Sequence, residues 1–169
     1  MITRRPTRLR GVPYVGFQRY FLTTCTAERH RAFERPPITE GCVLHLRRSA
    51  SRHELAIVAY CFMPDHLHVL AYGTSPQSDF QAFVVHFKKL TGFEYKRRHG
   101  RHLWQPGYHD RILRDEESTE AVARYILEKP VRAGLARQLG EYPFAGSDLY
   151  DAKALLTLWD GRSRRNRQD

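Results

Sequence analysis

The chain has 169 residues, of which 41% are hydrophobic and 12% aromatic; this composition excludes intrinsic disorder and favours one domain with a sizeable core. A net charge of +10, from 28 Lys and Arg against 18 Asp and Glu, points to a polyanionic partner, most often nucleic acid. No apolar run approaches the length that spans a bilayer, and the three scattered cysteines argue against a disulfide framework or a thiolate zinc site.

Basic segments stand at both ends of the expected domain. Residues 1–13 carry four arginines, among them Arg4 and Arg5, and we interpret them as a basic arm that can lie along DNA phosphates, with a disordered tail as the alternative. No apolar core follows these charges, so we expect no secretory signal, and the cysteine usage fits a reducing cytoplasm. We expect a single domain over 14–150 and an extension over 151–169 that ends in a second basic tail.

The predicted elements follow the order βαββαβ, with further helices after it. Strands are indicated where aromatic and β-branched residues gather, at 17–25, 54–62, 66–72 and 108–113. Helices are indicated by capping residues and apolar periodicity, from Thr39 to 48, from Ser78 or Asp79 to 99, from Ser118 to 129, and over 131–139. This order predicts the α+β class with a ferredoxin-like fold: an antiparallel sheet, helices on one face, and appended C-terminal helices.

Two histidines, His66 and His68, stand two residues apart in the third predicted strand. Successive side chains of a strand point to opposite faces, so the pair shares one face while Leu67 and Val69 point into the core. The first and third strands are central in this fold, and we expect the pair to face the side that the helices leave open. Two neutral imidazoles make half of a metal site, although the spacing alone is more typical of ordinary polar strand residues.

The residues around this pair resemble a known family. The sequence MPDHLHVL over 63–70 resembles the MPNHxHxL signature of the single-tyrosine HUH transposases of small insertion sequences, and more specifically their REP-associated tyrosine transposase branch. Three later stretches are similar to further motifs of that family in the same order, at 104–117, 124–135 and 142–147. The matches cover most of the chain, and they imply the HUH endonuclease fold.

The resemblance implies a metal-dependent endonuclease and strand transferase that acts on single-stranded DNA. Tyr125 matches the nucleophile, which attacks a phosphodiester, forms a 5′-phosphotyrosine and releases a 3′-OH. His66 and His68 match the metal-binding pair, for which we expect Mg²⁺ or Mn²⁺: imidazoles favour manganese in intrinsic affinity, whereas the family and cellular availability favour magnesium. A phenol is a poor nucleophile near neutral pH, so a metal or a base has to activate Tyr125.

The chain departs from the family at Lys129, four residues after Tyr125 and on the same helical face. The family has Asn or Gln here, whose amide oxygen completes the metal site, and an ammonium group cannot bind a cation. Three interpretations stay open. Glu128 supplies the missing oxygen, the metal binds through two histidines, phosphate and water, or Lys129 itself neutralises the phosphate with reduced metal dependence.

The expected partner is single-stranded DNA with a hairpin, which family analogy identifies as a repetitive extragenic palindrome (REP). A cationic groove and stacked bases hold single strands. We therefore expect DNA contacts from basic and flanking aromatic side chains: Lys88, Lys89, Lys96, Arg97, Arg98, Arg101, Trp104, Lys129 and Arg132, with Arg4 and Arg5 in the arm. We expect no membrane contact and no obligate protein partner, a monomer rather than a homodimer, and a place at the nucleoid in a bacterial cytoplasm.

A second hypothesis is a binding module. The same fold would clamp hairpin DNA or structured RNA with weak cleavage or none, because Lys129 has replaced a ligand. A replication initiator or relaxase of the same HUH class is a third interpretation, which usually brings a larger chain or a second tyrosine.

Overall fold

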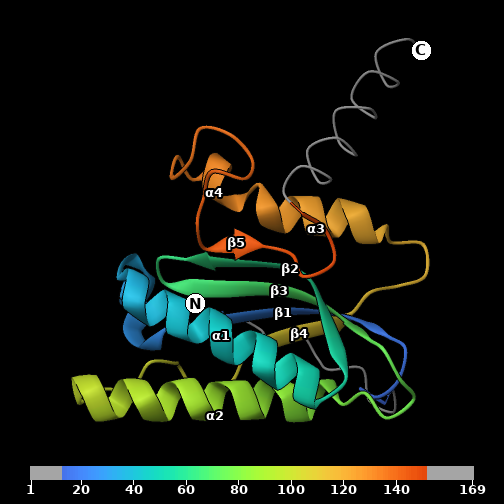
Figure 1. Ribbon diagram of the computed structural model, residues 1–169, viewed down its shortest axis with the longest axis horizontal. Coiled ribbons are helices and arrows are strands. Elements are labelled where there is room, and N and C mark those ends of the chain that lie inside the picture. Colours follow the sequence, from blue (N-terminus) through green and yellow to red (C-terminus); the bar gives the residue numbers. More distant parts are fainter. Residues whose placement is uncertain (1–12, 152–169) are drawn as a thin grey trace, which may run out of the picture.

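A computed structural model describes residues 13–151, and it contains one antiparallel sheet with helices on both faces (Figure 1). The strands lie in the order β4-β1-β3-β2-β5, with β1 at Arg19–Cys25, β2 at Leu55–Met63, β3 at His66–Gly73, β4 at His109–Ile112 and β5 at Ala145–Gly146. The helices are α1 at Pro36–Arg52, α2 at Phe80–His99, α3 at Thr119–Leu127 and α4 at Lys129–Arg132, with short 3-10 helices η1 at Ala27–Arg29 and η2 at Ala32–Glu34. The α+β class, the ferredoxin-like order and the central places of the first and third strands are confirmed. The basic arm, with Arg4 and Arg5, and the extension lie outside the described residues, apart from residues 13 and 151.

Helix α1 begins before the predicted cap at Thr39. Two prolines take its first positions, where a missing backbone N–H leaves no hydrogen bond unmade. Thr39 lies inside the first turn, and its hydroxyl donates to the Phe33 carbonyl at 2.9 Å. The caps predicted for the next two helices are confirmed, because the side chains of Asp79 and Ser118 each accept a backbone N–H from three residues further on.

The helix predicted over 131–139 is much shorter in the structure. Helix α4 ends at Arg132, because Gly134 adopts a left-handed conformation with a φ of 71° and the N–H of Leu135 closes on the Pro130 carbonyl at 2.8 Å. The sequence also gave no sign of β5, which pairs with the edge of β2. The segment after α4 therefore returns to the sheet as a strand.

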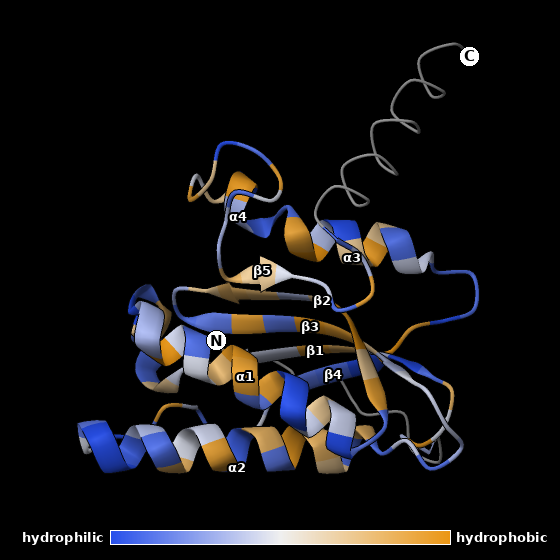
Figure 2. Ribbon diagram, viewed as in Figure 1, coloured by the Kyte–Doolittle hydropathy of each residue, from blue (hydrophilic) through white to orange (hydrophobic). Residues whose placement is uncertain are grey.

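Helices α1 and α2 cover one face of the sheet and enclose the larger core. Phe83 and Phe87 of α2 are fully buried there, in the same cluster as Leu67 and Val69 of β3. Figure 2 shows hydrophobic residues along the middle of β3 and hydrophilic ones in the last turn of α2. The alternation predicted for β3 is confirmed on this face.

Helix α3 packs on the opposite face, where Ala123 and Ile126 share a smaller core with Leu70 of β3. Figure 1 shows α3 on the other side of the sheet from α1 and α2. His66 and His68 share a face with Leu70, because they are two and four residues from it along the strand. The pair therefore points to the α3 side, and this side is partly covered rather than open as expected.

Replacing Gly73 by alanine is expected to destabilise the fold. A Cβ at this position would stand 1.8 Å from the carbonyl oxygen of Gly16, so the backbone would have to move. We expect Gly73→Ala to lower the free energy of unfolding by about 2 kcal/mol or more, as overpacking does. Urea denaturation measures the change.

Gly41→Ala in α1 is the matched control. Nothing lies within 4 Å of a Cβ built there, and alanine favours the helix by about 1 kcal/mol over glycine. Equal stability of the two variants would contradict the close approach of Gly16 to Gly73.

Candidate active site

The histidine pair lies at the start of the central strand β3. The two imidazole rings have centroids 4.8 Å apart and stand nearly perpendicular, at 84°. His68 is only 7% exposed, and His66 is half-buried. Strands β1 and β2 pair with β3 on its two sides, so the backbone under both rings is held on both edges.

Each imidazole uses its Nδ1 to bond a neighbouring side chain. His66 Nδ1 donates to Asp65 Oδ1 at 2.6 Å, and Asp65 Oδ2 accepts from Arg29 Nε at 2.9 Å. His68 Nδ1 is hydrogen-bonded to the Thr23 hydroxyl at 2.9 Å. Both Nε2 atoms are left for a ligand, which is the arrangement that orients metal-binding histidines in proteins.

The Nε2 atom of His68 is buried and has no hydrogen-bond partner among the described residues. A buried polar nitrogen without a partner is costly, and a metal ion would satisfy it. Two imidazole nitrogens therefore fit a divalent metal. Within residues 13–151, however, no three His, Cys, Asp or Glu side chains are grouped closely enough to hold one on their own.

The electrostatics of the site keep His68 neutral. Burial, followed by the charges of His66, Lys129 and Arg29, lowers the pKa of His68 to about 3. Burial alone would raise the pKa of Asp65, but the hydrogen bond and charge of His66, together with Arg29, hold that pKa below its usual range. A neutral imidazole keeps the lone pair that a metal requires.

Tyr125 lies on α3 with 40% of its surface exposed, between residues of that helix that are buried against the sheet. Two cations lie over its ring: the Lys129 ammonium is 4.3 Å from the ring centroid and the Arg132 guanidinium carbon 5.4 Å. A phenolate formed on this side chain would have positive charge close by. The structure thus brings Lys129 and Arg132 to Tyr125, and their contact with DNA stays a prediction.

Glu128 does not join the histidines. Its Oε1 accepts from Arg124 Nε at 2.5 Å and its Oε2 from an Arg132 nitrogen at 2.9 Å. Because α3 and α4 place these residues four apart on one helical face, the ion pairs form along the surface and away from β3. Both carboxylate oxygens of Glu128 are thus bonded to arginines in this structure, and its role as the third metal ligand stays a prediction.

Comparison with known proteins shows which family the chain belongs to. The family model described as Transposase IS200 like matches residues 16–129, which span the histidine pair, Tyr125 and Lys129. The chain belongs to this transposase family. It therefore has a DNA-transposing enzyme's framework, and the resemblance drawn from its motifs is confirmed.

Two relatives and one solved structure show how far the likeness extends. A chain named REP-associated tyrosine transposase in Haemophilus influenzae is 20% identical over 137 residues, or 75% of this chain and 77% of that one. The ISDra2 transposase TnpA of Deinococcus radiodurans is 31% identical over 129 residues, or 69% of this chain and 87% of that one. A REP-associated tyrosine transposase solved with a bound REP hairpin shares the fold, with a TM-score of 0.67 at 18% identity, covering 88% of this chain and 96% of that one.

Two side chains predicted to contact DNA also form hydrogen bonds within the fold of the transposase. Trp104 is 8% exposed, and its indole Nε1 donates to Thr91 at 2.9 Å, so little of this side chain is accessible in the structure, and its contact with DNA stays a prediction. The bridge between Thr26 and Trp104 draws this indole under α2. The Lys88 ammonium donates to the carbonyls of Gln105 and Gly107, and burial lowers its pKa to about 8.

The other predicted cations of α2 are exposed. They follow its outer face and its C-terminal end: Lys89, Lys96, Arg97, Arg98 and Arg101. Gly100 ends the helix in a left-handed conformation, and its N–H bonds the Lys96 carbonyl at 2.8 Å. Because α2 and α3 lie on opposite faces of the sheet, the structure does not bring this cluster to Tyr125 (Figure 1).

Sequence reasoning missed three residues that support the site. The motifs and their spacing predict no role at the site for Asp65, Thr23 or Arg29. The contact of Thr23 with His68 follows from the pairing register of β1 with β3, which a single sequence does not display.

None of the helices within residues 13–151 is long and apolar enough to cross a membrane.

Stability is expected to fall on acidification through His68. The folded pKa is about 3 and an unfolded imidazole titrates near 6.5, so in this interval the unfolded chain takes up a proton that the folded chain does not. The contribution is fully present above about pH 6.5 and declines as the pH falls towards 3. Between pH 7 and pH 5 we expect a loss of about 2 kcal/mol, at roughly 1.4 kcal/mol per pH unit.

His68→Gln should remove this part of the pH dependence while still offering a hydrogen bond to Thr23. Urea denaturation of both proteins in EDTA, at pH 7 and pH 5, measures the difference. The same pH dependence in the two proteins would contradict the neutral, buried state of His68.

Proposed function

We propose that this transposase cuts and rejoins single-stranded DNA beside a hairpin, with Tyr125 as nucleophile and His66 and His68 as metal ligands. The observation that carries the proposal is the unpartnered, buried Nε2 of His68, beside His66, on the sheet face where α3 presents an exposed tyrosine. His53 and His86 also leave buried ring nitrogens without partners among the described residues, but only His66 and His68 are an adjacent pair whose Nδ1 atoms are both bonded by neighbouring side chains, Asp65 and Thr23.

The metal would be held by the Nε2 atoms of His66 and His68, with Mg²⁺ or Mn²⁺ as the ion. When bound, such an ion polarises a phosphoryl oxygen and orients the phosphate for in-line attack. The side chains of the protein orient the metal ligands and supply further positive charge. Asp65 and Thr23 hold the two rings in place through Nδ1, and Lys129 and Arg132 hold positive charge beside the phenol.

Tyr125 then performs the chemistry in two reversible steps. Its hydroxyl oxygen bonds to the phosphorus, the bond from phosphorus to the 3′ oxygen breaks, and a 5′-phosphotyrosine remains. The phenol gives up one proton and the departing 3′ oxygen gains one, so a 3′-OH is released. A second 3′-OH can attack the phosphotyrosine in the reverse sense, and strands are rejoined without an external energy source.

Hairpin DNA is the partner we propose. The solved transposase that shares this fold was determined with a REP hairpin, which supports the same class of ligand here. The exposed cations of α2 supply phosphate contacts, and their sequence-independent attraction should be lost as salt increases. A binding module without cleavage is the second candidate, favoured by the absence of a third His, Cys, Asp or Glu at the pair among the described residues.

Covalent capture tests the proposal. The transposase is incubated with Mn²⁺ or Mg²⁺ and a labelled pool of hairpin oligonucleotides with randomised single-stranded flanks, and the products are run on a denaturing gel. We expect a protein–DNA adduct in the wild type, and at least a 10³-fold loss of it in Tyr125→Phe, since no other group supplies the nucleophile.

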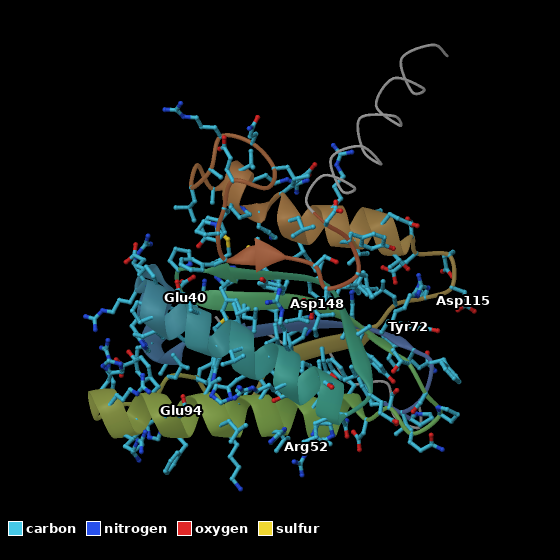
Figure 3. The ribbon with its side chains drawn as sticks, in the orientation of Figure 1. Glu40, Arg52, Tyr72, Glu94, Asp115 and Asp148 are labelled. Carbon is cyan, nitrogen blue, oxygen red and sulfur yellow. The ribbon has the colours of Figure 1, made fainter. Side chains whose placement is uncertain are left out.

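Tyr72→Phe is the matched control. Tyr72 is a second exposed tyrosine, on β3, six residues beyond His66 and labelled in Figure 3. It should form the adduct at the wild-type level. Tight hairpin binding without an adduct in either metal would select the binding module.

A further inference from the structure

We propose that Lys129 binds the phosphate under attack, and that its ammonium supplies positive charge where a third protein ligand would otherwise strengthen the metal site. The inference rests on the proposed nicking function, since it names a further group at the same site. It selects one of the three interpretations that the sequence leaves open for this lysine.

The ammonium of Lys129 lies beside the nucleophile. It is 4.3 Å from the centroid of the Tyr125 ring, closer than the Arg132 guanidinium carbon at 5.4 Å. Lys129 is the first residue of α4, one helical turn beyond Tyr125, so the backbone holds the two side chains on one face. A phosphate within reach of the Tyr125 hydroxyl is therefore close to this ammonium.

The residues that lead into Lys129 pack against the sheet. Leu127, two residues before Lys129, packs in the same buried cluster as Cys61 of β2. Cys61 and His68 are direct cross-strand partners. The segment that carries Lys129 thus packs on the histidine face of the sheet, where a phosphate has to bind for the tyrosine and the histidines both to act on it.

No carboxylate neutralises Lys129 within residues 13–151. The adjacent acidic side chain, Glu128, is instead paired with Arg124 and Arg132. A half-buried ammonium without an acidic partner is available to an anion. It carries three N–H donors and no acceptor, so it can bond the non-bridging oxygens of a phosphate but not a metal ion.

The arrangement divides the work of neutralising the phosphate between two groups. A phosphodiester carries one negative charge and gains a second as the phenolate attacks. The ammonium of Lys129 opposes that charge, and an ion held by His66 and His68 would oppose it from the other side. Part of the affinity for DNA is then independent of metal, and the metal is held more weakly than by a site with a third ligand, because Lys129 also repels it.

Lys129→Gln tests the inference because it removes the charge and offers an amide oxygen at the same position. All measurements are made in a Tyr125→Phe background, which keeps an aromatic ring in place and prevents cleavage. In EDTA, we expect hairpin pools with randomised flanks to bind about 10-fold more weakly, with the slope of log K against log salt smaller by about one. Mn²⁺ should bind the DNA-free protein about 10-fold more tightly, as measured by electron paramagnetic resonance titration.

Two further variants sharpen the comparison. Lys129→Arg should keep the DNA affinity in EDTA and show no gain in Mn²⁺ affinity. Arg48→Gln removes an exposed charge from α1, on the other face of the sheet, and should leave Mn²⁺ affinity unchanged.

An unchanged DNA affinity and salt slope in Lys129→Gln, or a Mn²⁺ affinity that does not rise, overturns the inference. Neither readout involves strand cleavage. Failure of the nicking reaction would therefore be seen separately, as the missing adduct in the wild-type protein.

Discussion

The whole site depends on β3 being hydrogen-bonded along both of its edges. Its pairing with β1 sets Thr23 opposite His68, and its pairing with β2 sets Cys61 on the other side of the same residue. A slip of one residue would turn both imidazoles towards the α1 and α2 core and bring Leu67 to the surface. Such a slip would have to break the hydrogen bonds of β3 to β1 and to β2 together. They also place the Thr23 hydroxyl at the Nδ1 of His68, which allows a neutral histidine to be buried with only its ligand-binding nitrogen unsatisfied.

Helix α4 begins directly after α3, and this continuity decides which charged side chains near the nucleophile pair with one another. Arg124, Glu128 and Arg132 follow one another at intervals of four residues, so the single carboxylate is held by two guanidinium groups. This leaves Lys129 to lie over the Tyr125 ring and to act on His68. A carboxylate turned towards the histidines would have favoured the metal and repelled the phosphate. The observed arrangement favours the phosphate.

Long-range contacts position α3 over the sheet. Before the helix, the Arg19 guanidinium of β1 donates to the carbonyls of Glu117 and Arg114 at 2.5 and 2.6 Å. After α4, the Tyr142 hydroxyl donates to the Phe62 carbonyl of β2 at 2.8 Å, and β5 adds to the same strand. The tyrosine-bearing helix is therefore tied to the two strands that flank β3, and nucleophile and histidines share one frame.

The sequence by itself determined what short-range periodicity and local chemistry control. The alternation of His66, Leu67 and His68 on one strand, the caps at Asp79 and Ser118, the succession of strands and helices, and the transposase motifs could all be predicted, because each depends on neighbours along the chain. Only the tertiary structure decided which partner each polar group takes. It buried Trp104 against Thr91, turned Glu128 to two arginines, and packed the end of α3 that leads to Lys129 against the histidine face of the sheet. These outcomes depend on the register of distant strands and on competition between charges that are close in three dimensions. Neither produces a periodic pattern of residues that could be recognised in one sequence.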